Sequence, residues 1–505
     1  MCRIRKWGQA IIGCLLIGLM LVTACQSVAY AANTTATTKP ATTTPATTPA
    51  STAQFQWPMQ IVGQFSISPG HAAIGDTVTA TGSGLTPGYK YTILWEDVIG
   101  SWDVDVVKGT YSGRNFADNW LTLATVTTDA QGNFKASFLV PEGFGFAHDV
   151  LVMDNGTIRN KCSFSVDMQA SLATTQGPLG SPITIVVKGM GWKDYQNGWH
   201  VLYDNQNVGI LTSVTTHGQA TAVIPATGGV GKHIIRVIEG AWTVSYLNHE
   251  ECPFPDTPTF TLVYEITSGA PVLPLPPAQQ TLPIQKGTAP APSQQPQIWT
   301  DPYLAPVGTP MTVRGAQMLA GVTVDLYWDG KSGNRVTSGG YQDTQTLLGS
   351  VKTSGNGTFE FTSVFPDTHG GLHLLEAQVD GKKIAETYFN ITPSAIGIEP
   401  ASGPVGTVIH IHLKAVSWTV TANNYYLVYD NVFNGYSCGF NSYGDVNIYL
   451  PATGQPGWHF IDLYPGIYKG TEKGSIDEFR TPQLTFTDHP GETLPAFHFA
   501  FYVTG

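Results

Sequence analysis

Apolar and polar side chains alternate with a period of two along much of the chain beyond residue 60. Between residues 409 and 414, for example, Ile409, Ile411 and Leu413 alternate with two histidines and a lysine. This period is typical of β-strands that bury one face. The glycine-containing stretches DAQGNF (129–134) and SGNGTF (354–359) predict turns between such strands. No helical period of useful length is present, so the pattern predicts an all-β protein.

The alternating segments occur as copies. GPLGSPITIVVKGMGW (177–192) matches GPVGTVIHIHLKAVSW (403–418) at an offset of 226 residues, and AIGDTVTATGSGL (73–85) matches PVGTPMTVRGAQM (306–318) at an offset of 233. The second offset falls to 225 by TDAQGNFKASFLVP (128–141), because the first copy carries eight extra residues between Trp95 and Val126. The order of units is therefore A, B, linker, A′, B′.

Each unit has about 100 residues, the size of an immunoglobulin-like sandwich with some seven short strands in two facing sheets. A Thr/Pro-rich tract precedes unit A, and a Pro/Gln-rich tract separates unit B from unit A′. Both tracts lack the apolar side chains that a core needs. The sequence thus predicts four tandem immunoglobulin-like β-sandwich domains after a signal sequence and a stalk. The expected boundaries are a signal peptide at 1–24, a Thr/Pro-rich stalk at 25–60, domain A at 61–167, domain B at 168–266, a linker at 267–297, domain A′ at 298–393 and domain B′ at 394–505.

The stretch LPATG (450–454) has the form L-P-x-T-G that sortases cleave in proteins bound for the bacterial cell wall. It stands where IPATG (224–228) stands in the earlier copy, and 51 residues of mixed polar and aromatic sequence follow it instead of an apolar stretch and a basic tail. Proline removes a backbone donor, and glycine accepts backbone angles that other residues resist. We therefore interpret LPATG as a turn between two strands.

The opening of unit B′ resembles the IPT/TIG family of immunoglobulin-like domains. The resemblance rests on IEPASGPVGTVI (398–409), and the stretch from Gly75 to Leu85 in unit A is similar. It covers the first strand or two of each unit, and Ala415 stands where the family usually has a glycine. The resemblance implies a binding, spacing or adhesion role, and it transfers no catalytic residues.

The start of the chain has the layout of a bacterial export signal. Basic residues at 3–6 precede an apolar run from Ala10 to Val22, which is too short for an ordinary membrane-spanning helix. The run ends in VTAC (22–25), which resembles the lipobox of bacterial lipoproteins, so we expect lipidation of Cys25; cleavage after Ala31 is the alternative. Either route exports the protein, and a lipid on Cys25 would be its tie to a membrane.

Composition adds two points. Charged residues make up 12% of the chain and the net charge is −11, which argues against nucleic acid or anionic lipid headgroups as partners. Cys162, Cys252 and Cys438 lie beyond the export signal. A Cys162–Cys252 disulfide is one reading, and small buried thiols are the other. We expect no cofactor.

Several patterns suggest chemistry, and for each we favour a structural interpretation. GYSCG (435–439) fits the G-x-S-x-G of hydrolase nucleophiles, but no helix follows it and Leu211 replaces the serine in the earlier copy. His410 and His412 share the outer face of a strand and could bind zinc, but they lack a third ligand. Asp129 fits an Asx-type turn better than a calcium site. A Gly-x-His pattern recurs once in each unit, and the four histidines cannot converge; they are His148, His233, His373 and His459.

The segment 96–125 is the best candidate for recognition, because it is longer than its counterpart and loops are free to carry binding. Aromatic faces beside carboxylates suit sugars. The alternative is an added strand pair with its aromatics in the core. Trp242 and Tyr246 form a weaker second candidate. The candidate ligand-binding residues in 96–125 are Trp102, Asp103, Asp105, Tyr111 and Trp120.

We therefore expect a non-enzymatic cell-surface or secreted protein with an adhesion, spacer or scaffold role, whose partner is a glycan or a surface protein. A carbohydrate-binding accessory protein that uses the aromatics of 96–125 is the alternative. An enzyme is a third possible class of protein, and this hypothesis predicts polar groups that converge in one pocket.

Overall fold

The computed structural model describes residues 57–505 except 194, 242–243, 248–256, 335–338, 440–442, 467–479 and 492. Over these residues the regular elements are strands, apart from two short 3-10 turns, η2 (Pro277–Gln279) and η3 (Phe486–Asp488). None of the described helical segments has the length and apolar character needed to cross a membrane. The described chain is all-β, as the alternation predicts.

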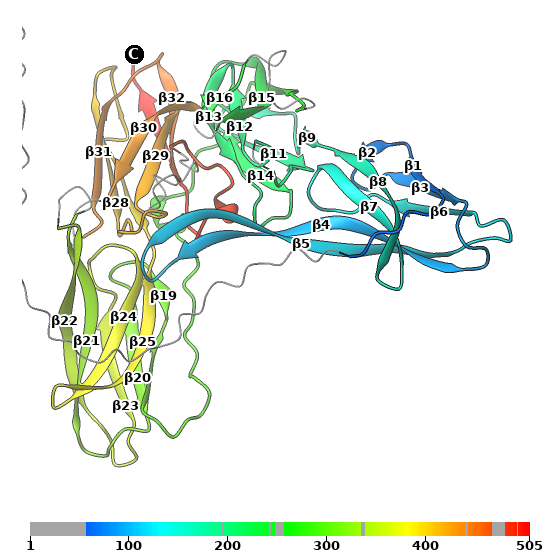
Figure 1. Cartoon of the computed structure of the whole chain (residues 1–505). Coiled ribbons are helices and arrows are strands. Elements are labelled where there is room, and N and C mark those ends of the chain that lie inside the picture. The colour runs from blue at the N-terminus through cyan, green and yellow to red at the C-terminus, as the bar shows by residue number, and fades with distance from the viewer. Residues whose placement is uncertain are drawn as a thin grey trace, which may run out of the picture. The chain divides into compact units, whose positions relative to one another are not determined.

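Unit A is a sandwich of two sheets (Figure 1). A three-stranded sheet of order β1-β3-β6 faces a five-stranded sheet of order β2-β8-β7-β4-β5. The strands are β1 (Gln64–Ser68), β2 (His71–Ala73), β3 (Thr77–Ser83), β4 (Lys90–Asp105), β5 (Thr110–Thr127), β6 (Phe134–Leu139), β7 (Phe146–Asp154) and β8 (Thr157–Asp167).

Unit B follows the same plan, with sheets of order β14-β11-β9 and β10-β17-β15-β12-β13 and with β16 paired to β15. Its strands are β9 (Gln169–Leu172), β10 (Gln176–Pro178), β11 (Pro182–Lys188), β12 (Trp199–Tyr203), β13 (Gln206–Leu211), β14 (Ala220–Pro225), β15 (Gly231–Ala241), β16 (Val244–Ser245) and β17 (Phe260–Thr267).

Units A′ and B′ repeat the plan again, with sheets β18-β20-β23 and β19-β25-β24-β21-β22 in A′, and β26-β28-β31 and β27-β33-β32-β29-β30 in B′. The strands of A′ are β18 (Gln297–Asp301), β19 (Leu304–Ala305), β20 (Pro310–Ala316), β21 (Thr323–Gly333), β22 (Tyr341–Lys352), β23 (Phe359–Val364), β24 (Gly371–Val379) and β25 (Lys382–Ile391). Those of B′ are β26 (Ser394–Glu399), β27 (Ser402–Gly403), β28 (Val408–Lys414), β29 (Asn424–Tyr429), β30 (Val432–Cys438), β31 (Val446–Pro451), β32 (Gly457–Pro465) and β33 (Phe497–Val503).

The sequence predicts about seven strands in each unit, and the structure has more. The extra strand arises because the first segment of each unit pairs with one sheet and then with the other. In A, β1 pairs antiparallel with β3, whereas the short β2 pairs parallel with β8. The short strands β10, β19 and β27 pair parallel with β17, β25 and β33 in the same way. Four tandem immunoglobulin-like sandwiches are therefore present, and the predicted fold class is confirmed.

The alternation buries one face of each strand. Ile409, Ile411 and Leu413 on β28 are completely buried, and the side chains between them lie on the opposite face. Ala415, which follows β28, has a φ of +57°, and the corresponding Gly84, Gly189 and Gln317 also have positive φ. The chain thus turns through the left-handed region after this strand in every unit, and a glycine suits such a position best.

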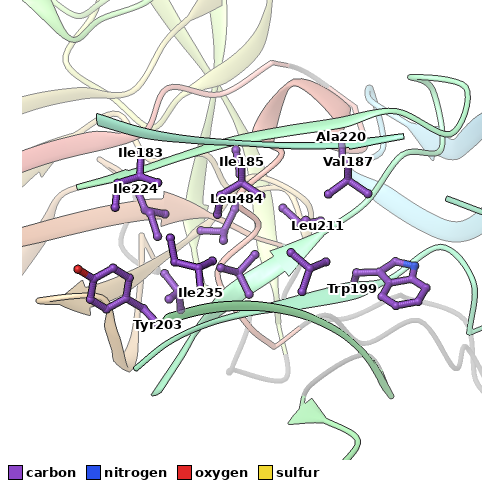
Figure 2. Packing of buried hydrophobic residues seen from close by; sticks show 14 of the residues in the cluster. Ile183, Ile185, Val187, Trp199, Tyr203, Leu211, Ala220, Ile224, Ile235 and Leu484 are labelled. Atoms are coloured by element: carbon purple, nitrogen blue, oxygen red, sulfur yellow. The ribbon is translucent and has the colours of Figure 1, made fainter. Parts of the chain in front are cut away.

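The core of B includes residues of B′. The buried cluster that holds Ile185, Trp199 and Leu211 also contains Val428, Tyr464, Leu484 and Ala496, all from B′. Figure 2 shows Leu484 among the labelled side chains of B, between those of its two sheets. Leu484 is 1% exposed, so the B sandwich is completed by a side chain from the last copy.

Candidate functional site: the junction between units

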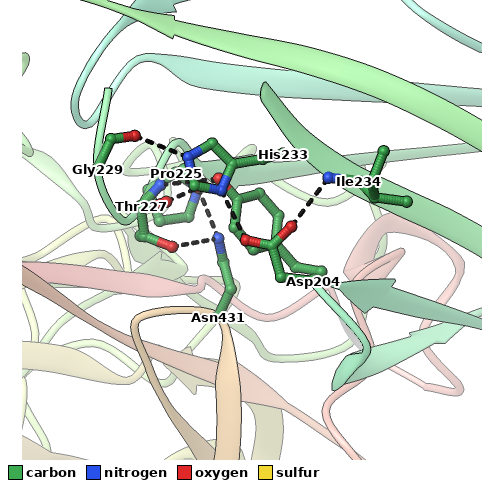
Figure 3. Close-up of polar contacts among 8 residues, drawn as sticks. Asp204, Pro225, Thr227, Gly229, His233, Ile234 and Asn431 are labelled. Carbon is green, nitrogen blue, oxygen red and sulfur yellow. Dashed lines mark hydrogen bonds and ion pairs between the residues drawn. The ribbon is translucent and has the colours of Figure 1, made fainter. Parts of the chain in front are cut away.

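The recurring histidines each bind parts of their own unit together, and Figure 3 shows the one in B, His233. In B, His233 Nδ1 lies 2.6 Å from Asp204 Oδ2 and Nε2 lies 2.8 Å from the Gly229 carbonyl. Asp204 Oδ1 also accepts from the Ile234 amide at 2.9 Å. Asp204 sits at the two-residue turn between β12 and β13, where it and Asn205 both have positive φ, so the YDN motif builds the turn and places the carboxylate.

The same tie recurs in the other units. His459 in B′ contacts Asp430 and the Gln455 carbonyl, and the hydrogen bond to Asp430 raises the pKa of His459. His148 in A lies between the carbonyls of Glu96 (2.8 Å) and Phe144 (3.0 Å), and burial lowers its pKa. His373 in A′ lies in the same way between the carbonyls of Asp329 and His369. The four histidines are structural, as the sequence analysis proposes.

The YDN motif stands at 203–205 in B and at 429–431 in B′, and the asparagine of the later motif makes contacts that its copy does not. Asn431 is completely buried, and its side-chain nitrogen donates to the Pro225 carbonyl at 2.7 Å and to Thr227 Oγ1 at 3.0 Å (Figure 3). Its counterpart in B, Asn205, is exposed. Asn431 therefore joins B′ to the turn that follows β14 of B.

The segment 481–489 of B′ continues this contact along β13 of B. Ile210 donates its amide to the Pro482 carbonyl at 2.8 Å, and Leu484 donates its amide to the Ile210 carbonyl at 2.9 Å. Asp488 is completely buried and accepts from the amides of Val214 (2.7 Å) and Thr215 (2.6 Å) and from Thr215 Oγ1. The segment thus pairs with an edge strand of B, and its carboxylate satisfies a buried loop.

The predicted recognition segment is a long β-hairpin. Strands β4 and β5 have 16 and 18 residues, whereas the corresponding β21 and β22 have 11 and 12 (Figure 1). Near its tip Tyr111 is completely buried in a cluster with Ile210 of B, against which Trp102, Val104 and Val420 of B′ pack. The Val420 amide also donates to the Gly109 carbonyl at 3.4 Å. The hairpin of A therefore contacts both B and B′.

The candidate residues of the hairpin do not form one exposed platform. The rings of Trp102 and Tyr111 are 6.1 Å apart and inclined by 53°, and Tyr111 has no exposed surface. Trp120 packs edge-on against Trp57 at 5.2 Å. Asp105 accepts from the amides of Val107 and Lys108 in the tip turn and pairs with the Lys108 ammonium at 2.8 Å; Asp103 is exposed.

At the base of the hairpin an ion pair joins A to B. Asp97 is 3% exposed and accepts from His217 Nε2 at 2.6 Å and from Asn119 at 3.0 Å. Burial is the largest single influence on the pKa of Asp97 and raises it, but the hydrogen bond and charge of His217 together with hydrogen bonds from Asn119 and the Val98 backbone outweigh burial, so that pKa is lowered. The same hydrogen bond raises the pKa of His217. The pair therefore favours a protonated imidazole beside an ionised carboxylate.

A groove lies over the outer face of the five-stranded sheet of A′. It encloses about 670 Å³. Its floor comes from β21, β22, β24 and β25, and its walls include Lys108 at the hairpin tip of A and Trp418 of B′, so three units contribute side chains. The side chains on its floor that bear on ligand chemistry are Tyr327, Asp329, Gln345, Glu376 and Tyr388.

Charged groups of both signs line this groove. The Lys331 ammonium lies 4.5 Å from the centre of the Trp418 ring and pairs with Asp343. Gln345 donates to Glu376 Oε2 at 3.0 Å. Burial raises the pKa of Asp329. We refer to this feature as the junction groove. Tyr327, Asp329 and Lys331 alternate on the polar face of β21, but nothing in the sequence indicates that Lys108 and Trp418 reach this face from other units.

The remaining motifs are built into strands and turns. Ser437 of GYSCG lies within β30 and donates to the Tyr425 carbonyl at 3.2 Å. LPATG spans the end of β31 and the turn before β32, with Gly454 at a φ of +104°. Asp129 accepts from the amides of Gln131 and Asn133, which makes the expected Asx-type turn.

His410 and His412 lie side by side with ring centres 6.0 Å apart, and His410 Nε2 donates a hydrogen bond to Asn447 Oδ1 at 2.8 Å. Among the described residues no group of three or more His, Cys, Asp or Glu side chains could hold a metal ion.

Some predicted residues lie outside the described part of the chain. These are Cys25 and the stalk up to residue 56, Trp242, and Cys252. Lipidation and the Cys162–Cys252 disulfide therefore stay predictions. Cys162 itself is half-buried, and burial raises the pKa of its thiol to about 11. Tyr246 is half-buried beside β15, where its amide donates to the Glu239 carbonyl.

The paired sheets define a protein of four immunoglobulin-like sandwiches that share contacts across their junctions. No family model and no curated protein matches the chain. Among solved structures it is similar to Salmonella alpha-2-macroglobulin reacted with methylamine, with 9% identity over 88% of this chain and 31% of that chain and a TM-score of 0.18. The chain thus spans about a third of the length of that protein.

Two further similar structures are smaller. An ICAM-5 ectodomain fragment shows 12% identity over 87% of this chain and 99% of that chain, with a TM-score of 0.16. A putative membrane anchored protein from Corynebacterium diphtheriae shows 10% identity over 65% of this chain and 88% of that chain, with a TM-score of 0.18. Likeness at this level carries no argument about what the chain does.

Proposed function

We propose that this chain is an exported, non-enzymatic scaffold of the bacterial cell surface that presents a binding surface for adhesion. The export signal and Cys25 support a surface location, with the lipid as the tie to the membrane and the Thr/Pro-rich stalk as the link to the folded units. The binding partner in this proposal is a glycan or a surface protein.

The observation that carries the proposal is the completion of the B core by Leu484 of B′. Independent domains joined by flexible linkers would each bury a core of their own and would move relative to one another. Here a buried side chain, a buried asparagine and a buried carboxylate of B′ all contact B. Such contacts hold the units in a fixed register, which is what a scaffold requires and what a flexible spacer does not.

The proposal is tested with the full chain expressed in a bacterium. Antibody labelling of intact cells and digestion by an external protease should both detect it, and cells that carry it should adhere to a coated glycan or matrix-protein surface better than cells without it. A cytoplasmic location, or no gain of adherence on any coated surface, would contradict the proposal. Turnover of glycosidic, ester or peptide substrates by the purified chain would contradict the non-enzymatic part.

A further inference from the structure

We propose that the junction groove is a saccharide site and that its ligand is a neutral glycan. This inference rests on the proposed surface function and names the ligand class for it. The groove's volume of about 670 Å³ lies in the range of small-molecule sites, which occur preferentially at domain interfaces. Three units meet at this groove, so the ligand would contact all three.

The register of the sheet places two rows of side chains on the floor of the groove. In one row Tyr388 on β25 is paired with Leu374 on β24, and Asp329 on β21 is paired with Gln345 on β22. In the next row Tyr327 on β21 is paired with Glu376 on β24. The second row therefore sets the ring of Tyr327 beside a carboxylate, and in the first row Leu374 stands between Tyr388 and the strand that carries Asp329.

This mixture matches the two kinds of surface on a sugar ring. The C–H face of the sugar can pack on an aromatic ring, and its hydroxyl groups both donate and accept hydrogen bonds. Tyr388 is 43% exposed, so its ring is available for such stacking. Only Val107 and Leu374 are aliphatic among the residues that line the groove, and the rest of its apolar surface comes from aromatic rings: Tyr327, Tyr341, Tyr388 and Trp418.

The charge of the lining selects against acidic sugars. Asp329, Asp343 and Glu376 supply three carboxylates, whereas Lys108 and Lys331 supply two ammonium groups, which leaves one negative charge. The chain as a whole carries a net charge of −11. An anionic glycan would meet repulsion from both the groove and the surrounding field.

The outer face of the five-stranded sheet in unit A is the counterpart of the groove floor in A′, and in A it is covered by apolar side chains. The offset of 233 relates Leu94 to Tyr327, and the offset of 225 relates Leu151 to Glu376. In A these two leucines lie in an apolar cluster under Trp57 and Trp120. In A′ the same positions carry a tyrosine and a carboxylate and line an open groove. Two positions that serve packing in A therefore carry groups suited to a sugar in A′.

The test uses the full chain purified in detergent and a panel of immobilised and free oligosaccharides: gluco-, manno- and N-acetylchito-hexaose as neutral probes, and oligogalacturonate and heparin fragments as acidic probes. We expect saturable binding of at least one neutral hexaose by calorimetry, and no tighter binding of an acidic probe. Tyr388→Ala should weaken the neutral ligand about tenfold, because one well-placed ring accounts for such a step in affinity.

The control is Tyr449→Ala, which removes a tyrosine that is 65% exposed on the three-stranded sheet of B′, away from the groove. Unchanged melting temperatures of both variants confirm that they fold. No saturable neutral binding, preference for an acidic probe, or equal binding by the Tyr388→Ala variant would overturn the inference. If Tyr388→Ala removes binding to a matrix protein and no glycan binds, the groove takes a protein and the saccharide assignment is wrong.

Failure here is distinguishable from failure of the proposed function. Cells that adhere to a coated surface equally well with Tyr388→Ala retain the surface role while excluding this groove as its site. Cells whose chain is found in the cytoplasm, with a groove that still binds a hexaose in vitro, retain the site while excluding the surface role.

Discussion

Truncation of Leu484 to alanine tests whether B′ completes the core of B. Leu484 is 1% exposed among side chains of B. The hydrogen bond from its amide to the Ile210 carbonyl is a backbone contact that the substitution leaves in place. The lost side chain leaves a cavity that the paired backbone cannot close easily. Buried Leu→Ala changes cost about 2–5 kcal/mol, so we expect about 3 kcal/mol. In a cooperative body of about 200 residues this lowers the melting temperature by roughly 6–12 °C.

Scanning calorimetry gives the melting temperature, and hydrogen exchange shows where protection is lost. If Leu484 completes the core of B, exchange becomes faster in β12 and β15 of B, more than 200 residues from the mutated position. Leu319→Ala is the control, because Leu319 is 74% exposed, and it should change the free energy of unfolding by less than about 0.5 kcal/mol. A cost below about 1 kcal/mol for Leu484→Ala, or faster exchange confined to residues 480–503, would refute the shared core.

Two further predictions concern the junctions between units, and a third concerns the lipobox. A Cβ on Gly209 would lie 2.4 Å from the Pro482 carbonyl oxygen, so Gly209→Ala should destabilise the chain by about 1–3 kcal/mol in chemical denaturation, whereas the matched Gly435→Ala, with open space around it, should be nearly neutral. The pKa of His217 is raised above 6.5 chiefly by its hydrogen bond to Asp97, so the stability from this pair is complete below that pH and is lost as the pH rises through the folded-state pKa. The melting temperature of the wild type minus that of His217→Gln should therefore shrink between about pH 6 and pH 9, and a constant difference would contradict it. If Cys25 is lipidated, Cys25→Ala should move the chain from the membrane fraction to the medium, and an unchanged distribution in cell fractionation would count against the lipobox.

The sequence predicts the sandwich fold well, because the signals that specify it are local. Ile409, Ile411 and Leu413 alternate within one strand, and the YDN turn before Gln206 needs only residues that accept positive φ. Comparison of the copies also indicates structural roles for the four histidines, LPATG and GYSCG, because a position that serves packing recurs in each unit whereas a catalytic residue need not. The division of the first strand between two sheets was missed, because nothing in its residues marks the change of partner.

The junction could not be predicted in this way. Leu484 and Tyr111 look like ordinary core residues of their own units, and only the packing between units assigns them to a neighbour. The candidate aromatics of 96–125 lie on an extended hairpin, and the burial of Tyr111 depends on Ile210 of another unit. The junction groove was missed for the same reason, since Trp418 reaches it from B′.

The late position of Leu484 in the chain has a consequence for biogenesis. A polypeptide made from its N-terminus presents the strands of B long before residue 484 emerges, so one flank of the B sandwich stays open until that residue is made. Contacts that close such long loops form slowly. Completion of the B fold is therefore coupled to the arrival of residues 481–489, and a chain truncated before residue 481 would expose apolar side chains of B, where quality-control proteases could recognise it.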